Sequence, residues 1–169
     1  MGESTDEDHE SLAAQAGRVL LAAGLRAVTA ESCTGGRVAR AMTDVPGSSQ
    51  WFERGYVTYS NAAKMQDLGV EAGALEQHGA VSAAVVEQMV TGALRASGAD
   101  IAVAVSGVAG PDGGSLEKPV GLVYLGVGRR GGTVRVHREL FAGDRAQVRH
   151  AAVRAALLLL AELAAAREF

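Results

Sequence analysis

The chain has 169 residues, 48% of them hydrophobic and 21% charged, which is typical of one soluble globular domain with a sizeable core. Its formal net charge of −3, with arginines scattered along the sequence, excludes the basic face of a nucleic-acid-binding protein. The single cysteine, Cys33, excludes an internal disulfide and fits a reducing cytoplasm. Neither a secretory signal nor a membrane-spanning apolar run is visible, so we expect no membrane partner.

The chain opens on an acidic segment, residues 1–10, with almost nothing apolar to bury, and we predict a disordered tail there. Residues 11–169 are predicted to form a single domain. It begins with a helix over residues 11–23, because apolar residues recur at helical spacing and Gly24 supplies a stop.

A strand–turn–helix unit follows. A β-favouring run at residues 27–30 leads into the polar, glycine-rich turn 31–36, and helix formers resume over 37–42. This places Ser32 and Thr34 at the carboxyl end of a strand, beside helical N–H groups that favour negative charge. The position suits a phosphate or the oxyanion of an acyl transfer. It equally suits a simple helix cap at Thr34, with glycines that only permit the turn.

The remaining elements alternate between strands and helices. After a break at residues 46–49 we predict a strand over 51–59, helices over 61–68, 71–79 and 83–97, a buried central strand over 101–105, hairpin strands over 120–127 and 133–141, and a closing helix over 144–166 capped by Asp144. This order predicts an α/β fold, a three-layer α/β/α sandwich with a mixed, partly parallel sheet. A second glycine-rich loop over 106–115 also follows a strand, so both loops can share one cleft.

Lysine usage points to a candidate base. Only two of the 16 basic residues, Lys64 and Lys118, are lysines. Unlike arginine, a partly buried lysine can become neutral and accept a proton. Lys64 follows a strand end rich in hydroxyl groups, so Lys64 alone or a Tyr59–Lys64 pair is a candidate base for Ser32. For either lysine the alternative is chance retention at the surface, and for Lys118 we favour a solvated charge over a phosphate contact.

Other candidates carry weaker signals. Ser60, four residues before Lys64, is a rival nucleophile, and so is Cys33, although a lone cysteine is more often a small buried residue. Asp112 can ligate a metal, but Gly-Pro-Asp-Gly-Gly is first of all a turn sequence. The four histidines lie singly and no Cys/His cluster has zinc spacing, so we expect no metal and no cofactor.

Five blocks of residues stand out together, at 30–36, 51–64, 78–82, 106–121 and 143–145. They include Ala-Glu-Ser-Cys-Thr-Gly-Gly, Thr-Tyr-Ser-Asn before Lys64, His-Gly-Ala-Val-Ser, Ser-Gly-Val-Ala-Gly-Pro-Asp-Gly-Gly with Lys-Pro-Val-Gly, and Gly-Asp-Arg. In this order they closely resemble the nicotinamide-nucleotide amidohydrolase family, the domain also found at the C-terminus of competence-damage-inducible protein A. The resemblance runs from residue 11 to residue 163.

The resemblance implies hydrolysis of the carboxamide of nicotinamide mononucleotide (NMN) to nicotinic acid mononucleotide and ammonia, in pyridine-nucleotide salvage. It implies a serine nucleophile, which maps onto Ser32, with Lys64 as the base, Tyr59 beside it and no metal. Backbone N–H groups over residues 33–36 are candidates for binding the oxyanion. The predicted substrate-binding residues are Thr34, Gly35, Gly36, Asn61, Ser106, Gly107, Ala109, Gly110 and Arg145.

Two other functions stay open at this point. One is a non-catalytic nucleotide- or phosphate-binding module, which would gain nothing from a lowered pKa at Lys64. The other is an amidohydrolase for a different small amide. In each case the expected partner is a small molecule, and the apolar residues 157–160 of the closing helix add the prospect of a homo-oligomer.

Overall fold

A five-stranded mixed sheet forms the centre of the computed structural model, which describes residues 3–167. Its strands are β1 (Ala27–Glu31), β2 (Phe52–Val57), β3 (Ile101–Gly107), β4 (Leu122–Arg129) and β5 (Val134–Leu140), in the order β2-β1-β3-β4-β5. β1 pairs in parallel with both β2 and β3, whereas β4 is antiparallel to β3 and to β5. The predicted partly parallel sheet with an antiparallel hairpin is therefore confirmed.

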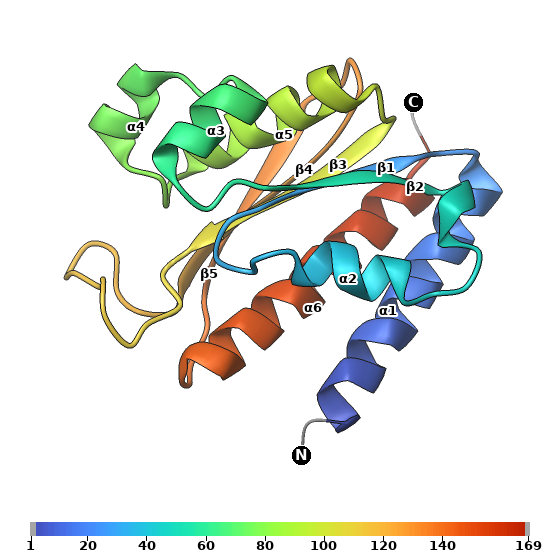
Figure 1. Cartoon of the computed structure of the whole chain (residues 1–169), viewed down its shortest axis with the longest axis horizontal. Coiled ribbons are helices and arrows are strands. Elements are labelled where there is room, and N and C mark those ends of the chain that lie inside the picture. Colours follow the sequence, from blue (N-terminus) through green and yellow to red (C-terminus); the bar gives the residue numbers. More distant parts are fainter. Residues whose placement is uncertain (1–2, 168–169) are drawn as a thin grey trace.

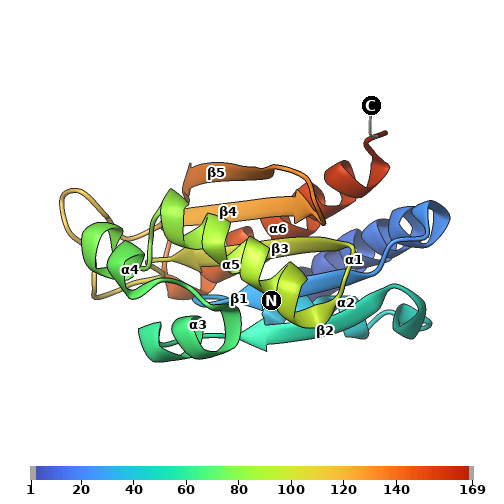
Figure 2. The ribbon, with the colours of Figure 1, turned by 90° about the horizontal axis from the view of Figure 1, so that it is seen from above.

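Helices cover both faces of this sheet (Figures 1 and 2). On one face lie α1 (Glu3–Ala23), α2 (Arg37–Thr43) and α6 (Arg145–Ala165), and on the other lie α3 (Asn61–Leu68), α4 (Ala72–His78) and α5 (Ala83–Ser97). A single 3₁₀ turn, η1 (Ser48–Gln50), precedes β2. The three-layer α/β/α prediction is confirmed.

Two hydrophobic cores result from the alternation of side chains along the central strands. Ile101, Val103 and Val105 of β3 pack with α1, α2 and α6, whereas Ala102 and Ala104 pack with α5. Because β3 is buried on both faces, it reads in sequence as a continuous apolar run rather than an alternating one.

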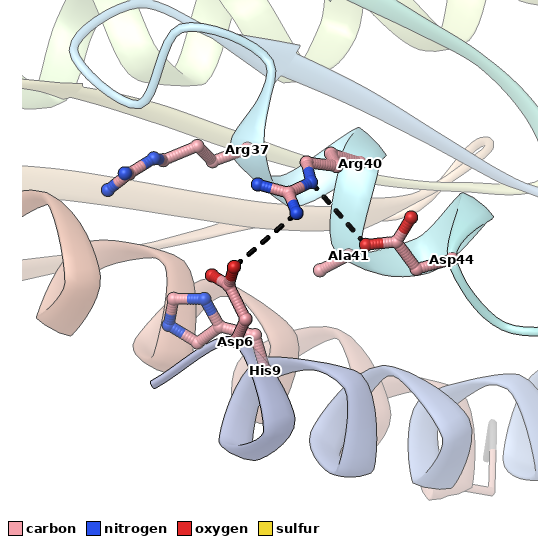
Figure 3. A pocket seen from close by; sticks show the side chains of 6 residues that line it. All are labelled: Asp6, His9, Arg37, Arg40, Ala41 and Asp44. Carbon is pink, nitrogen blue, oxygen red and sulfur yellow. Dashed lines mark hydrogen bonds and ion pairs between the residues drawn. The ribbon is translucent and has the colours of Figure 1, made fainter. Parts of the chain in front are cut away.

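The N-terminal helix differs from the sequence prediction. α1 begins at Glu3, so residues 3–10 are helical rather than a disordered tail, and residues 1–2 lie outside the described part of the chain. Acidic side chains there meet arginines of other helices: Asp6 contacts Arg40, which also contacts Asp44 (Figure 3), and Asp8 lies 3.0 Å from Arg154. Exposed ion pairs of this kind contribute little, so the main anchor is the buried alanine and leucine stripe further along α1.

The closing helix buries most of the surface that suggested self-association. Leu157 and Leu160 are fully buried in the core, and only Leu158 is substantially exposed, at 42%. Across residues 3–167, no helix has both the length and the hydropathy that a bilayer crossing requires.

Side-chain caps fix the start of the helices around the cleft described below. The Ser60 hydroxyl accepts the Ala63 N–H, and the Ser82 hydroxyl accepts the Val85 N–H. Asp144 and Gln147 form a reciprocal capping box at the start of α6. The predicted cap at Asp144 is confirmed.

Gly92 of α5 allows α3 to approach closely. A Cβ atom at this position would clash with the backbone carbonyl of Leu68 at the end of α3. We expect Gly92→Ala to lower the free energy of unfolding by about 1–3 kcal/mol through overpacking. Denaturant unfolding would measure this, with Gly73→Ala as the matched control because no atom lies within 4 Å of a Cβ there. Equal unfolding midpoints for the two variants would contradict the expectation.

Candidate active site

Three strand ends meet at one edge of the sheet. Because β1, β2 and β3 are parallel, their carboxyl ends lie together, with β1 in the middle. Ser32 follows β1, Thr58 follows β2, and Ser106 lies at the end of β3. A cleft of about 290 Å³ opens at this edge, so the two glycine-rich loops share one cleft as predicted.

Most of the predicted site residues reach this cleft. It is lined by Ser32, Tyr59, Lys64, Ser106, Gly107, Ala109, Gly110 and Arg145, and also by Cys33 and Asp112. Thr34, Gly35, Gly36 and Asn61 do not line it: Thr34 is buried, Gly35 is exposed, and Asn61 is exposed at the start of α3.

Ser32 and Lys64 are in direct contact. Lys64 lies in the first turn of α3, and its side chain is only 1% exposed. Its Nζ lies 3.0 Å from Ser32 Oγ, 2.7 Å from the Thr58 carbonyl oxygen and 3.5 Å from the Tyr59 carbonyl oxygen. The amine is therefore surrounded by oxygen atoms without formal charge.

The surroundings of Lys64 favour its neutral form. Burial lowers the pKa of Lys64 from its ordinary value. Within residues 3–167 no carboxylate forms a salt bridge with Lys64, and the neighbouring Cys33 raises the pKa of Lys64 by less than burial lowers it. A neutral amine in contact with a serine hydroxyl can accept the hydroxyl proton.

Tyr59 occupies a different place from the one that a proton relay needs. Its side chain is 63% exposed, and its hydroxyl accepts a hydrogen bond from Arg145 Nη2 at 3.2 Å. Arg145 Nη1 also donates to the Gly110 carbonyl at 2.8 Å. Lys64 thus reaches Ser32 without Tyr59 between them, and Tyr59, Arg145 and Gly110 together form one wall of the cleft.

The turn after Ser32 holds unused backbone donors. The Ser32 N–H donates to Val105, and the Gly35 N–H donates to the Ser32 carbonyl. Throughout residues 3–167, no carbonyl partner is found for the N–H groups of Cys33, Thr34 or Gly36. Gly35 and Gly36 have φ values of +58° and +96°, which only glycine adopts readily.

Thr34 does not cap the following helix. The residue at the cap position of α2 is Gly36, and Thr34 is fully buried, with no hydrogen-bond partner for its hydroxyl in the part of the chain that the structure describes. The interpretation of this turn as a simple helix cap at Thr34 is therefore wrong.

Two charged residues that the sequence analysis passed over hold this turn. The fully buried Glu31 carboxylate accepts the N–H groups of Val38 and Ala39 at 2.9 and 3.1 Å. Arg149 Nε donates to the Cys33 carbonyl at 2.9 Å. Burial lowers the pKa of Arg149, and Arg37 and Arg145 nearby lower it further. Its spacing of four residues from Arg145, which places both on one helix face, is the signal that could have found it.

The rival nucleophiles are less suited to the chemistry. Burial raises the pKa of Cys33 to about 11, which keeps the thiol protonated and unreactive. The Ser60 hydroxyl serves as the α3 cap. Lys118 does not line the cleft, and its Nζ donates to the His78 carbonyl in an exposed contact. Asp112 reaches the cleft, but the described residues contain no group of three or more potential metal ligands.

Comparison with known proteins gives matches along nearly the whole chain. The family model of the CinA C-terminal domain matches residues 9–164. Nicotinamide-nucleotide amidohydrolase PncC of Escherichia coli K12 is 54% identical over 156 residues, 92% of this chain and 94% of that protein. The Pseudomonas putida protein of the same name is 58% identical over 147 residues, 87% of this chain and 91% of that protein.

The fold also matches a solved structure. The crystal structure of competence/damage inducible protein CihA from Agrobacterium tumefaciens superposes with a TM-score of 0.90 at 48% identity, covering 92% of this chain and 95% of that one. The fold described above is therefore that of a known group of proteins.

Proposed function

Because this chain belongs to the CinA C-terminal domain family, we propose that it is a cytoplasmic amidohydrolase that converts NMN to nicotinic acid mononucleotide and ammonia. The names of the relatives in Escherichia coli and Pseudomonas putida support the substrate. The observation that carries the mechanism is the 3.0 Å contact between Ser32 Oγ and the buried Lys64 Nζ. In this proposal Ser32 is the nucleophile and Lys64 is the general base.

Lys64 is well placed to take the Ser32 proton. A neutral amine has two N–H groups and one lone pair. The Thr58 and Tyr59 carbonyls accept from the two N–H groups, at 2.7 and 3.5 Å, and the lone pair then faces the Ser32 hydroxyl. This arrangement sets the direction of proton transfer before substrate binds.

The reaction then follows the course of serine acyl transfer. Ser32 Oγ attacks the carboxamide carbon as Lys64 takes its proton, and backbone N–H groups after Ser32 stabilise the oxyanion. Lys64 returns the proton to the departing nitrogen, which leaves as ammonia. Water, activated in turn by Lys64, hydrolyses the acyl-enzyme and regenerates Ser32.

The cleft wall offers contacts for the rest of the nucleotide. Arg145 donates two of its five N–H groups to Gly110 and Tyr59, and the other three remain for the phosphate. Ser106 is nearly fully buried and its hydroxyl donates to the Ala80 carbonyl, so we assign it to shaping the cleft floor. Tyr59 is a substrate contact in this proposal rather than a proton carrier.

Ammonia release from three amides tests the proposal: NMN, nicotinamide riboside and free nicotinamide, each with and without chelator. We expect strong preference for NMN, because only NMN carries the phosphate, and no effect of chelator. Equal turnover of all three would indicate an amidohydrolase for another amide. A well-folded protein that binds NMN without hydrolysing it would indicate the non-catalytic binding module.

Arg145→Ala is expected to raise the KM for NMN by about 10- to 100-fold, the equivalent of losing charge-assisted hydrogen bonds to phosphate. The kcat for NMN should change little, since Arg145 does not contact Ser32 or Lys64. Nicotinamide riboside is the matched substrate, and its kcat/KM should be nearly the same in wild type and variant. Arg154→Ala, on the same helix but paired with Asp8, is the control. An unchanged KM for NMN would remove the phosphate role of Arg145.

A further inference from the structure

Three arginines lie at the surface beside the cleft. Arg145, which lines the cleft, and Arg149 are four residues apart on α6, so their side chains leave the same face of the helix. Arg149 Nη2 and the backbone N–H of Arg37 both donate to the Thr34 carbonyl, which makes the start of α2 a direct neighbour of Arg149. Neither Arg37 nor Arg149 lines the cleft, and the turn residue next to them, Gly35, is exposed.

The charges of these three arginines are not balanced by carboxylates. Within residues 3–167 none of the three forms a salt bridge. Arg40 of α2 pairs instead with two aspartates, and Figure 3 shows the Arg37 side chain extending away from Arg40. Burial lowers the pKa of Arg149, the charges of Arg37 and Arg145 lower it further, and no carboxylate of the described residues raises it. In a chain whose net charge is −3, this is a local positive patch at the mouth of the cleft.

Two of the guanidinium groups are already held in place. Arg149 Nε donates to the Cys33 carbonyl at 2.9 Å, and Arg145 Nη1 donates to the Gly110 carbonyl at 2.8 Å. Each keeps further N–H groups for a ligand, since a guanidinium carries five. Guanidinium groups that are fixed beforehand bind phosphoryl oxygens with a smaller loss of side-chain freedom, which favours a phosphorylated ligand.

We propose that Arg37, Arg145 and Arg149 form a site for two linked phosphoryl groups, which takes inorganic pyrophosphate or the diphosphate part of a nucleotide. One phosphoryl group lies on Arg145, where the single phosphate of NMN is also proposed to bind, and the second lies between Arg149 and Arg37. Residues four apart on a helix have Cβ atoms about 5–6 Å apart, a separation that two linked phosphoryl groups can span. A diphosphate therefore competes with NMN. This competition rests on the proposed function, whereas binding of the diphosphate does not.

Inhibition of NMN hydrolysis by pyrophosphate and by orthophosphate, in buffer without divalent metal, tests the site. Pyrophosphate should compete with NMN and inhibit at a concentration at least about 10-fold lower than orthophosphate, because it gains charge-assisted hydrogen bonds to two further arginines. Arg37→Gln should raise the inhibition constant of pyrophosphate about 10-fold and leave the KM for NMN and the inhibition constant of orthophosphate near wild type. Arg40→Gln, on the same short helix, is the matched control and should change none of these values.

Titration calorimetry with pyrophosphate separates failure of this site from failure of the proposed function, because it needs no turnover. Pyrophosphate binding that is weakened by Arg37→Gln and not by Arg40→Gln supports the site even if the protein does not hydrolyse NMN. Adenosine diphosphate in the same titration identifies the source of the ligand: tighter binding than pyrophosphate indicates a nucleotide, and equal or weaker binding indicates inorganic diphosphate. Equal affinity for orthophosphate and pyrophosphate, inhibition that does not compete with NMN, or an equal loss in Arg37→Gln and Arg40→Gln would overturn the proposal.

Discussion

Ser32→Ala is expected to lower kcat for NMN hydrolysis by about 10⁴- to 10⁶-fold, the range for removing the nucleophile of a serine hydrolase. Cys33, the nearest rival nucleophile in the cleft, is a poor replacement. Burial raises the pKa of the neighbouring Cys33 thiol to about 11, so its thiolate is scarce at neutral pH. The loss should be confined to catalysis, since the variant removes one oxygen atom and keeps the backbone of the turn. The measurement is ammonia release, paired with thermal unfolding.

Ser60→Ala is the matched control for this change. The Ser60 hydroxyl accepts the Ala63 N–H and begins the helix that carries Lys64. Its loss should cost about 1 kcal/mol of stability, as for other serine caps, and leave most of the turnover in place. Turnover retained by Ser32→Ala and lost by Ser60→Ala would transfer the nucleophile to Ser60. Turnover retained by both would transfer it to Cys33.

The sequence predicts the layers of this fold well because local signals and global topology agree. The apolar run at residues 101–105 predicts a strand covered on both faces, and the cap at Asp144 marks a helix start; the structure confirms both. What it could not predict is strand order. That β1 lies between β2 and β3 follows from long-range pairing, which leaves no local pattern.

The N-terminal helix shows why charge alone misleads. Residues 1–10 carry little apolar surface, so the sequence predicts a disordered tail. In the structure Asp6 and Asp8 face Arg40 and Arg154, and the helix continues back to Glu3. Those arginines lie 34 and 146 residues away along the chain, so the pairing is invisible to any local reading.

The sequence predicts that Ser32 and Lys64 lie together, but not which residues support them. Ser32 follows a strand, Lys64 is one of only two lysines and lies in α3, and the structure brings them into contact. Arg149 contributes through its contact with backbone carbonyls, which no side-chain motif encodes. The resemblance implies Tyr59 beside Lys64 as part of the base, but the tyrosine hydroxyl accepts a hydrogen bond from Arg145 instead.

Replacing Lys64 is the second change that we expect to lower NMN turnover strongly. Lys64→Arg keeps a basic side chain that stays protonated and so cannot act as a base, and Lys64→Met keeps the approximate length without any nitrogen. Both are expected to lower kcat/KM for NMN by at least about 10³-fold, since base and nucleophile act as a unit. Lys118→Met replaces the only other lysine of the chain and is the control, with turnover near wild type. Steady-state ammonia release for the four proteins measures this.

The pH dependence follows from the direction of the Lys64 pKa shift. Only the neutral amine can take the Ser32 proton, so kcat/KM should rise with pH as Lys64 loses its proton. Because burial lowers the pKa of Lys64, this rise should come below the ordinary lysine pKa of 10.5. A profile that rises only at that ordinary value would contradict a buried neutral base.

Stability should depend on pH in the same direction. In the window between the folded and unfolded pKa values of Lys64, the unfolded chain binds a proton that the folded chain does not. The free energy of unfolding therefore rises with pH across this window and is reduced below it, and Lys64→Met lacks this slope.

A non-catalytic binding module would gain nothing from the loss of stability that a buried lysine causes. If Lys64→Arg bound NMN as wild type does and wild type released no ammonia, the catalytic role of Lys64 would be refuted. If instead Lys64→Arg still bound NMN but lost turnover, proton transfer would be the reason that a buried amine lies beside Ser32.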